Sequence, residues 1–272
     1  MRLTVLVDNN AREGLTAAHG LSLYIETDGR RILFDLGPDG ALLLKNAEAL
    51  GIDLKSVDMA ALSHGHSDHA GGLEAFLTVN ERAPVYVQKQ ALEGHFVDKG
   101  KGLRDLSADA TLPERFPKRI RKVFAIILPE DGLYFFALVP LKHPAGKAHD
   151  WFFSGSMDKP VPDDFKHEMH LLVHEGPDWY LFAGCAHQGI QNILEHAADL
   201  IGVMPKAVFG GLHLMDEDAE TVAATGAALQ AMGVDVYTDH CTGDAAYAQL
   251  KDLLGDRIHR FQAGDSFVLG DD

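Results

Sequence analysis

The chain of 272 residues has few cysteines, few basic residues and no long apolar run. Its two cysteines, Cys185 and Cys241, are too few for a disulfide framework and fit a reducing compartment, so we expect a cytoplasmic protein. No window approaches the roughly 18 consecutive apolar residues of a membrane span. The N-terminal apolar run is also too short for a signal peptide. We therefore expect a soluble protein with no membrane partner.

Basic residues are scarce relative to acidic ones. Lysine and arginine total 24 against 40 for aspartate and glutamate, which gives a formal net charge of -16. Such a surface repels a phosphate backbone at long range, so we expect a small-molecule substrate and no nucleic-acid partner. The negative net charge does not exclude an anionic substrate, because a bound dication reverses the electrostatics of its own pocket. The sequence does not determine the oligomeric state, and it is compatible with a homo-oligomer.

The hydrophobic pattern predicts strands and helices that alternate along both halves of the chain. A hairpin turn at Asp28-Gly29 joins the second and third strands. Strands are predicted at residues 3–7, 21–26, 31–34, 57–62, 84–88, 123–128, 133–139, 169–174, 179–183, 207–209 and 234–238. Helices are predicted at residues 41–50, 71–79, 190–201, 216–232 and 244–254.

In each half the strands come first and helices follow. This order favours two mixed sheets packed together with helices outside, in a single domain over residues 1–272. Residues 94–122 are charged and contain glycines and prolines, so we expect an irregular insertion or lid there.

The predicted strand at 57–62 leads into a cluster of side chains that can bind metals. Within six positions the chain places His64, His66, Asp68 and His69. Imidazole and carboxylate suit zinc and other first-row metals. On a sharp turn, alternate residues can face one metal while the next two face a second. The alternative is a solvated histidine-rich loop, but chance rarely supplies this spacing.

Three further histidines, His187, His213 and His240, each follow a predicted strand beside a glycine-containing turn. Strand ends are where α/β sheets place their sites. Each histidine alone would be read as an ordinary loop residue. Together they strengthen one another as candidates for the same site.

The stretch from Ser63 to His69 resembles the signature of the metallo-β-lactamase superfamily. The resemblance implies an α/β fold of the α+β type, an αββα sandwich with a dinuclear metal site at one edge. Other segments resemble a narrower subfamily, the class II metal-dependent hydrolases, which includes archaeal dihydropterin ribofuranosyl-aminobenzene phosphate synthases. These segments are Asp8-Asn9, Gly14-Leu15, residues 19–22, 32–37, 184–187 and 210–213, and 240–243.

The same resemblance assigns metal ligands. It implies that His64 and His66 bind a first metal and that Asp68 and His69 bind a second. The superfamily then has a histidine, a bridging aspartate after a strand, and a final histidine. In this chain no aspartate stands at that strand end, which reads Gly-Cys-Ala-His. We expect the remaining ligands to be His187 for the first metal and His240 for the second, with Cys185 a candidate for the bridging group.

Several of these assignments have alternatives. Cys185 can instead be a small buried side chain that fills the strand end. His213 is an alternative ligand to His240, or a proton donor or substrate contact. His167 and His170 stand at about the right distance to supply the third histidine, although the alternation of their strand also explains them.

Three polar residues near the N-terminus are candidates for supporting roles. His19 and Asn9 lie on the first loop and are candidate substrate contacts, with simple turn chemistry as the alternative. Asp35 is expected to orient a ligand histidine through a hydrogen bond.

The expected activity is hydrolysis of an ester, phosphoester, lactone or amide by a metal-bound hydroxide, with Asp68 and His213 as catalytic residues. Two divalent cations are the expected cofactors, with zinc favoured over manganese, iron or magnesium. The subfamily gives a second expectation, a transferase that couples a dihydropterin diphosphate to an aryl-amine ribotide. A third is a non-catalytic metal- or ligand-binding protein. Serine-elbow and P-loop chemistry are excluded, because neither motif occurs.

Overall fold

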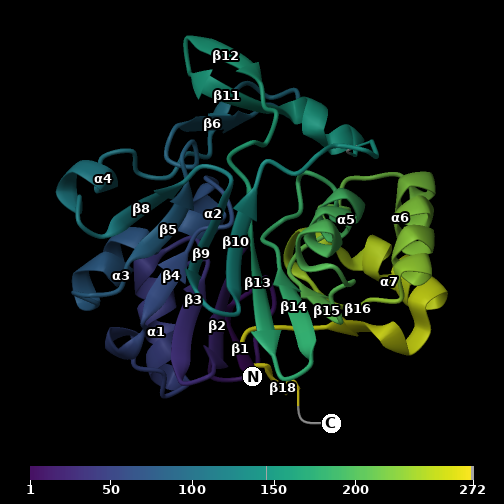
Figure 1. Ribbon diagram of the computed structural model, residues 1–272. Helices are drawn as coiled ribbons and strands as arrows, with labels where there is room; N and C mark the ends of the chain where they lie inside the picture. The colour runs from purple at the N-terminus through teal and green to yellow at the C-terminus, as the bar shows by residue number, and fades with distance from the viewer. Residues whose placement is uncertain (145, 271–272) are drawn as a thin grey trace.

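Two seven-stranded sheets form the centre of the computed structural model, which describes residues 1–144 and 146–270. The sheets pack face to face with helices on both outer sides (Figure 1). The predicted αββα sandwich is therefore confirmed. Among the described residues, no helix is both long enough and apolar enough to cross a membrane.

The first sheet comes mainly from the N-terminal half of the chain. Its order is β18 (Ser266–Val268), β1 (Arg2–Val7), β2 (Ser22–Thr27), β3 (Arg30–Phe34), β4 (Met59–Ala61), β5 (Val85–Gln88) and β8 (Ile120–Val123). The predicted hairpin joins β2 to β3, where Asp28 and Gly29 have φ of 48° and 73°. Two successive positive φ angles are the mark of a type I′ turn, which explains the Asp-Gly pair.

The second sheet comes from the C-terminal half. Its order is β17 (Ile258–Arg260), β16 (Asp235–Thr238), β15 (Ala207–Phe209), β14 (Asp178–Phe182), β13 (Met169–Glu175), β10 (Leu133–Ala137) and β9 (Ile126–Glu130). The strands from β14 to β17 are parallel neighbours. In the first sheet β3, β4, β5 and β8 are parallel as well. Each parallel set brings its carboxyl ends to one edge of its sheet.

Helices cover the two outer faces because each has an apolar side. The first sheet is covered by α1 (Gly40–Ala49) and α3 (Leu73–Val79), with the short η1 (Leu54–Ser56) between them. The second sheet is covered by α5 (Ile190–Ile201), α6 (Ala219–Met232) and α7 (Asp244–Leu254), followed by η4 (Gly255–Arg257). The helix predicted from residue 216 begins later, because the Asp218 carboxylate accepts the Thr221 N–H at 2.9 Å and caps it.

The single strand predicted at 123–128 is two strands. β8 ends at Val123 and pairs with β5 in the first sheet, whereas β9 begins at Ile126 and pairs with β10 in the second. The chain crosses between the sheets in the two residues between them. An apolar segment has the same hydrophobic pattern whether its residues lie in one sheet or cross from one sheet to the other. The sequence pattern therefore could not locate this crossing.

The segment 94–122, expected to be irregular, contains regular elements. It includes β6 (Gly94–Val97), β7 (Arg104–Asp105) and α4 (Leu112–Arg115), and it ends in β8. β6 and β7 join β11 (Phe152–Ser156) and β12 (Lys159–Pro162) in a four-stranded sheet of order β12-β11-β6-β7. This small sheet, which we call the cap sheet, lies over one end of the sandwich (Figure 1). The side chains of Phe96 and Val97, which belong to β6 of this sheet, are buried.

Candidate metal centre

The predicted site residues leave both sheets at the same end of the sandwich. His64 and His66 follow β4, while His187, His213 and His240 follow β14, β15 and β16. The loops after β4 and β14 touch so closely that a Cβ added at Gly184 would lie 2.0 Å from Ser63 Oγ. Glycine is therefore required where the two sheet ends meet. The structure brings all five of these histidines into one region.

Asp35 fixes the start of the metal motif. It stands directly after β3, and its carboxylate accepts the Ser63 N–H and the Ser63 hydroxyl, each at 2.7 Å. The same carboxylate lies 2.6 Å from His69 Nδ1. The hydrogen bond expected between Asp35 and a motif histidine is thus present. Burial alone would lower the pKa of His69, but Asp35 and Asp68 raise it to about 9, so a bound cation would have to displace the proton from Nε2 while Asp35 holds the proton on Nδ1.

Cys185 belongs to two groups of buried donor atoms. His64, Cys185 and His187 form one group, and His69, Cys185 and His240 form the other. Within each group the donor atoms lie within 4.8 Å of one another. Cys185 Sγ and His240 Nε2 are each 3.1 Å from His69 Nε2. Tetrahedral ligands at zinc–nitrogen distances of about 2.0–2.1 Å are roughly 3.3 Å apart, so this spacing fits a metal.

Asp68 and His66 add further donor atoms. Asp68 Oδ2 lies 3.7 Å from His69 Nε2, 3.5 Å from His240 Nε2 and 3.4 Å from His19 Nε2. His66 Nδ1 is 3.0 Å from His64 Nε2. All six predicted metal ligands and Cys185 therefore lie together.

Unsatisfied nitrogens provide a test of whether a metal fits. The residues described include no hydrogen-bond partner for His66 Nε2, nor for either ring nitrogen of His187. Burying such groups without partners is costly, and native proteins avoid it. Neutral imidazole, thiolate and carboxylate are the donor set that zinc prefers. The donor set and its orphaned nitrogens thus fit divalent cations.

Burial and neighbouring charges set the protonation of the cluster. Burial, with the neighbouring imidazoles, holds the pKa values of His64, His187 and His240 well below the ordinary 6.5, so these rings are neutral, as metal ligands must be. Burial alone would raise the pKa of Asp68, but His69 and His240 lower it to about 2. Burial also raises the pKa of the Cys185 thiol, so a bound dication would have to displace its proton.

Backbone strain is concentrated at this site. Asp35, Ala186, His213 and His240 have φ between 48° and 61°, in the left-handed region that L-residues rarely adopt. Each such residue costs on the order of 1–3 kcal/mol and persists only where its surroundings impose it. Here the strain turns the chain sharply after β3, β14, β15 and β16, so that each loop places a side chain at the site.

Two residues hold the ligand loops in place. The buried Glu168 carboxylate accepts the backbone N–H groups of His187 and Gln188 at 2.8 and 2.9 Å. The Asn9 amide lies 3.1 Å from His240 Nδ1 through Oδ1 and donates to the His240 carbonyl at 3.0 Å. Asn9, expected as a substrate contact, thus lies against His240, and both ends of its amide are engaged there.

The segment that follows β7 of the cap sheet hydrogen-bonds to the metal motif. The N–H of Ser67 donates to the Leu106 carbonyl at 2.7 Å, and the N–H of Ala108 donates to Gly65 at 3.0 Å. Gly65 N–H donates to His167 Nδ1 at 3.1 Å. His167 is therefore a neighbour of the motif that fixes its backbone. The other alternative ligand, His170, packs against Phe136.

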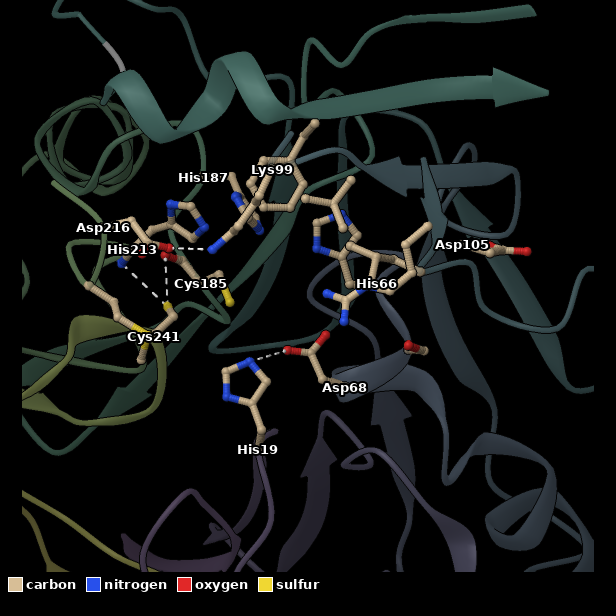
Figure 2. A pocket seen from close by; sticks show the side chains of 16 residues that line it. His19, His66, Asp68, Lys99, Asp105, Cys185, His187, His213, Asp216 and Cys241 are labelled. Carbon is tan, nitrogen blue, oxygen red and sulfur yellow. Dashed lines mark hydrogen bonds and ion pairs between the residues drawn. The ribbon is translucent and has the colours of Figure 1, made fainter. Parts of the chain in front are cut away.

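A pocket of about 360 Å³ opens beside the cluster. Its walls include His19, Asp68, Cys185, His187 and His213, with the rim cations Lys99 and Arg104 from the cap sheet region. Figure 2 shows Cys185 pointing into this pocket, with His187 and His213 on the same wall and Asp68 facing His19 below them. Lys99 Nζ is 2.6 Å from the Asp216 carboxylate.

Several residues of the site were missed by sequence reasoning. Lys99 and Arg104 lie in the segment read as irregular, and His149 and Phe152 lie between predicted elements, so no motif marked them. Glu168 did carry a signal, because a carboxylate directly before a buried strand must have partners.

Comparison with known proteins agrees with this geometry. The sequence profile of the metallo-beta-lactamase superfamily matches residues 15–199. A curated relative from Methanocaldococcus jannaschii is 29% identical over 265 residues, covering 90% of this chain and 88% of the relative. That protein is named 7,8-dihydropterin-6-methyl-4-(beta-D-ribofuranosyl)-aminobenzene-5'-phosphate synthase.

Solved structures show the same fold. Tm1679, described as a metal-dependent hydrolase of the beta-lactamase superfamily, is 29% identical with a TM-score of 0.84, and the match covers 100% of both chains. Zn²⁺-bound PqqB from Methylobacterium extorquens is 13% identical with a TM-score of 0.59, covering 99% of this chain and 100% of PqqB, and it shows likeness of fold alone. The matched profile covers more than half of the chain. The protein therefore belongs to the metallo-beta-lactamase superfamily.

Proposed function

We propose that the protein is a metal-dependent hydrolase of a small molecule and that it holds two divalent cations, with zinc favoured. The observation that carries this proposal is Cys185, whose Sγ belongs to a buried histidine group on each side. Its place after β14 is where the superfamily resemblance expects a bridging aspartate. The proposed ligands are His64, His66 and His187 for one cation and Asp68, His69 and His240 for the other, with Cys185 shared.

Bound cations would lower the pKa of a coordinated water and stabilise the negative charge that develops on an ester, phosphoester, lactone or amide oxygen. Side chains of the protein would orient the water and contact the leaving group. We assign the orientation of the attacking water to Asp68, whose carboxylate faces the pocket. We assign hydrogen bonding to the leaving group to His213, because burial lowers the pKa of this ring to about 3 and keeps it neutral, and its Nδ1 lacks a partner in the described structure.

Two N-terminal residues take different roles in this proposal. The His19 side chain is 58% exposed and lies on the pocket wall, so it can contact a substrate. Asn9 instead positions His240, since its amide oxygen and nitrogen are both engaged there. Burial of Phe152 and Val97 on the cap side limits water entry beside the reacting groups.

Removal of metal should abolish hydrolysis. Dialysis against a chelator should remove activity on a panel of chromogenic esters, phosphodiesters and lactones, and zinc or manganese should restore it. The double variant His66→Ala, Asp68→Ala should lose more than about 100-fold in kcat/KM, the scale expected for one lost electrostatic stabiliser.

A matched control is the double variant His143→Ala, Asp150→Ala, because neither residue lies in the proposed metal groups. It should keep wild-type turnover. Intact turnover by the His66, Asp68 variant would refute the hydrolase proposal. Tight metal binding without turnover across the panel would favour the non-catalytic alternative.

A second candidate is a transferase that couples a dihydropterin diphosphate to an aryl-amine ribotide. The name of the Methanocaldococcus jannaschii relative favours it, and so does Arg104 at the pocket rim, since a cation there suits an anionic group. With the metal-loaded protein and a dihydropterin diphosphate, this function requires pyrophosphate release only when the amine is added. Release without the amine would instead indicate hydrolysis.

A further inference from the structure

The second sheet ends in a strand whose outer side is apolar and exposed. β9 is the last strand of that sheet, and β10 is its only strand partner among the described residues (Figure 1). Ile127 packs against the core between the sheets, whereas Ile126 and Leu128 are 44% and 53% exposed. Ile126 pairs with Phe136, which belongs to the core beneath the helices. The helices that cover this face therefore leave β9 uncovered.

Two neighbouring side chains extend this apolar edge. Phe124, in the crossing between β8 and β9, is 64% exposed, and Leu138, directly after β10, is exposed as well. The two segments are joined there, because the N–H of Ala137 donates to the Ala125 carbonyl at 2.7 Å. A sheet edge with unpaired backbone groups and exposed apolar side chains is a template for another strand. Contiguous apolar patches of this kind mark interaction surfaces.

The side chains at the two ends of β9 carry opposite charges. At its start Lys89 is held beside Val123, whose carbonyl accepts the Lys89 N–H at 2.9 Å. At its end Glu130 and Asp131 follow one another. Glu130 pairs with Arg30, but the side chains of Lys89 and Asp131 have no ion pair in the part of the chain that the structure describes. Both are exposed, so each is free to meet a charge on another molecule.

We propose that β9 binds a second copy of this chain, which pairs antiparallel with it about a two-fold axis at Ile127. This register sets Ile126 of one copy opposite Leu128 of the other, so that the exposed apolar side chains meet on one face. Each contact occurs twice, as a two-fold dimer requires. Pro129 has no N–H, so the backbone pairing is confined to residues 126–128.

Charge selects this occupant and its orientation. In the proposed register Val123 is opposite Asp131 of the second copy, which brings Lys89 to that aspartate at both ends of the pairing. A parallel arrangement would instead set like charges together. The chain has a net charge of -16, which opposes association that lacks such local pairs. A pairing this short buries less than the roughly 1,600 Å² of a standard interface, so we expect a dimer that dissociates on dilution.

Sedimentation velocity of the full chain over a range of concentrations tests the proposal. The wild type should form a species with the mass of two chains, and Leu128→Lys should stay monomeric at the same concentrations. The reason is that the variant sets a charged side chain against Ile126 of the second copy. The control is Val203→Lys, in an exposed position beyond the end of α5, which should dimerise like the wild type. All three should give the same circular dichroism spectrum, because both positions are exposed.

Charge reversal tests the register. Lys89→Glu and Asp131→Lys should each weaken the dimer, because each sets like charges together at both ends. An equimolar mixture of these two variants should dimerise again, since the mixed pair has opposite charges at both contacts.

Three results would each overturn the proposal. They are a dimeric Leu128→Lys variant, a mixture no more associated than its separate components, and a wild type that is monomeric at every concentration. The last would leave a different partner as the occupant of β9. Since the readout is mass, the outcome does not depend on the hydrolase proposal.

Discussion

Zinc content should fall by at least one ion per chain when Cys185 is replaced by alanine, and Cys185→Asp should restore it. The reason is that Cys185 Sγ is common to the His64–His187 group and the His69–His240 group. Alanine removes a donor from both groups at once. Aspartate offers two oxygens on a short side chain, so one carboxylate can bridge two cations where a single sulfur would. Hydrolytic activity should follow the metal content in both variants.

The matched control is Cys241→Ser. Cys241 is also buried and lines the same pocket. Its Sγ lies 3.3 Å from the His213 backbone nitrogen and 3.7 Å from the Cys185 carbonyl, but it is not a member of either histidine group around Cys185. It should keep the wild-type zinc content. Wild-type zinc content in Cys185→Ala would show that this cysteine only fills the strand end, which is the alternative that its sequence context left open.

The Asp35→Asn variant should lose about 10- to 100-fold in zinc affinity at the site containing His69, the range typical for residues that orient metal-binding histidines. Asp35 Oδ2 lies 2.7 Å from the Ser63 hydroxyl and 2.6 Å from His69 Nδ1. An amide nitrogen at that position cannot accept either proton. His69 would respond by carrying its proton on Nε2, the atom that faces Cys185 and His240. The free energy of unfolding should also fall, by about 1–3 kcal/mol.

Competition against a chromogenic chelator measures this affinity, and urea unfolding measures the stability. Asp58→Asn is the control, because Asp58 also lies beside β4 but hydrogen-bonds the backbone N–H of Arg31, away from the cluster. It should keep wild-type zinc affinity. An Asp35→Asn variant with unchanged affinity would mean that the His69 tautomer is not set by this carboxylate.

The sequence predicted the sandwich and the main cluster because both depend on local patterns. Apolar runs marked most strands, the Asp28-Gly29 turn marked the first hairpin, and the spacing of His64 to His69 marked the motif. Each of these signals lies within a few consecutive residues. Neighbouring parallel strands have their carboxyl ends at the same edge of a sheet. The histidines that follow β14, β15 and β16 could therefore be predicted to belong to one site.

The rest depends on contacts between distant segments. The cap sheet pairs β6 with β11, more than 50 positions along the chain, and neither strand has an apolar pattern strong enough to mark its partner. His149 lies beside His187 and His213 in a segment whose backbone N–H groups donate to the distant Glu217 carboxylate. Short strands such as β17 and β18 gain their stability from sheet pairing rather than from propensity, so local reasoning missed them.

Anomalous scattering at the zinc edge, on crystals of the zinc-loaded protein, tests the central claim most directly. We predict two strong peaks at the junction of the His64–His187 and His69–His240 groups, with Cys185 Sγ at bonding distance from both, about 2.3 Å. Asp68 and His69 should bind one metal, and His64 and His66 the other. A single peak at this junction, or a Cys185 side chain bonded to neither metal, would contradict the account.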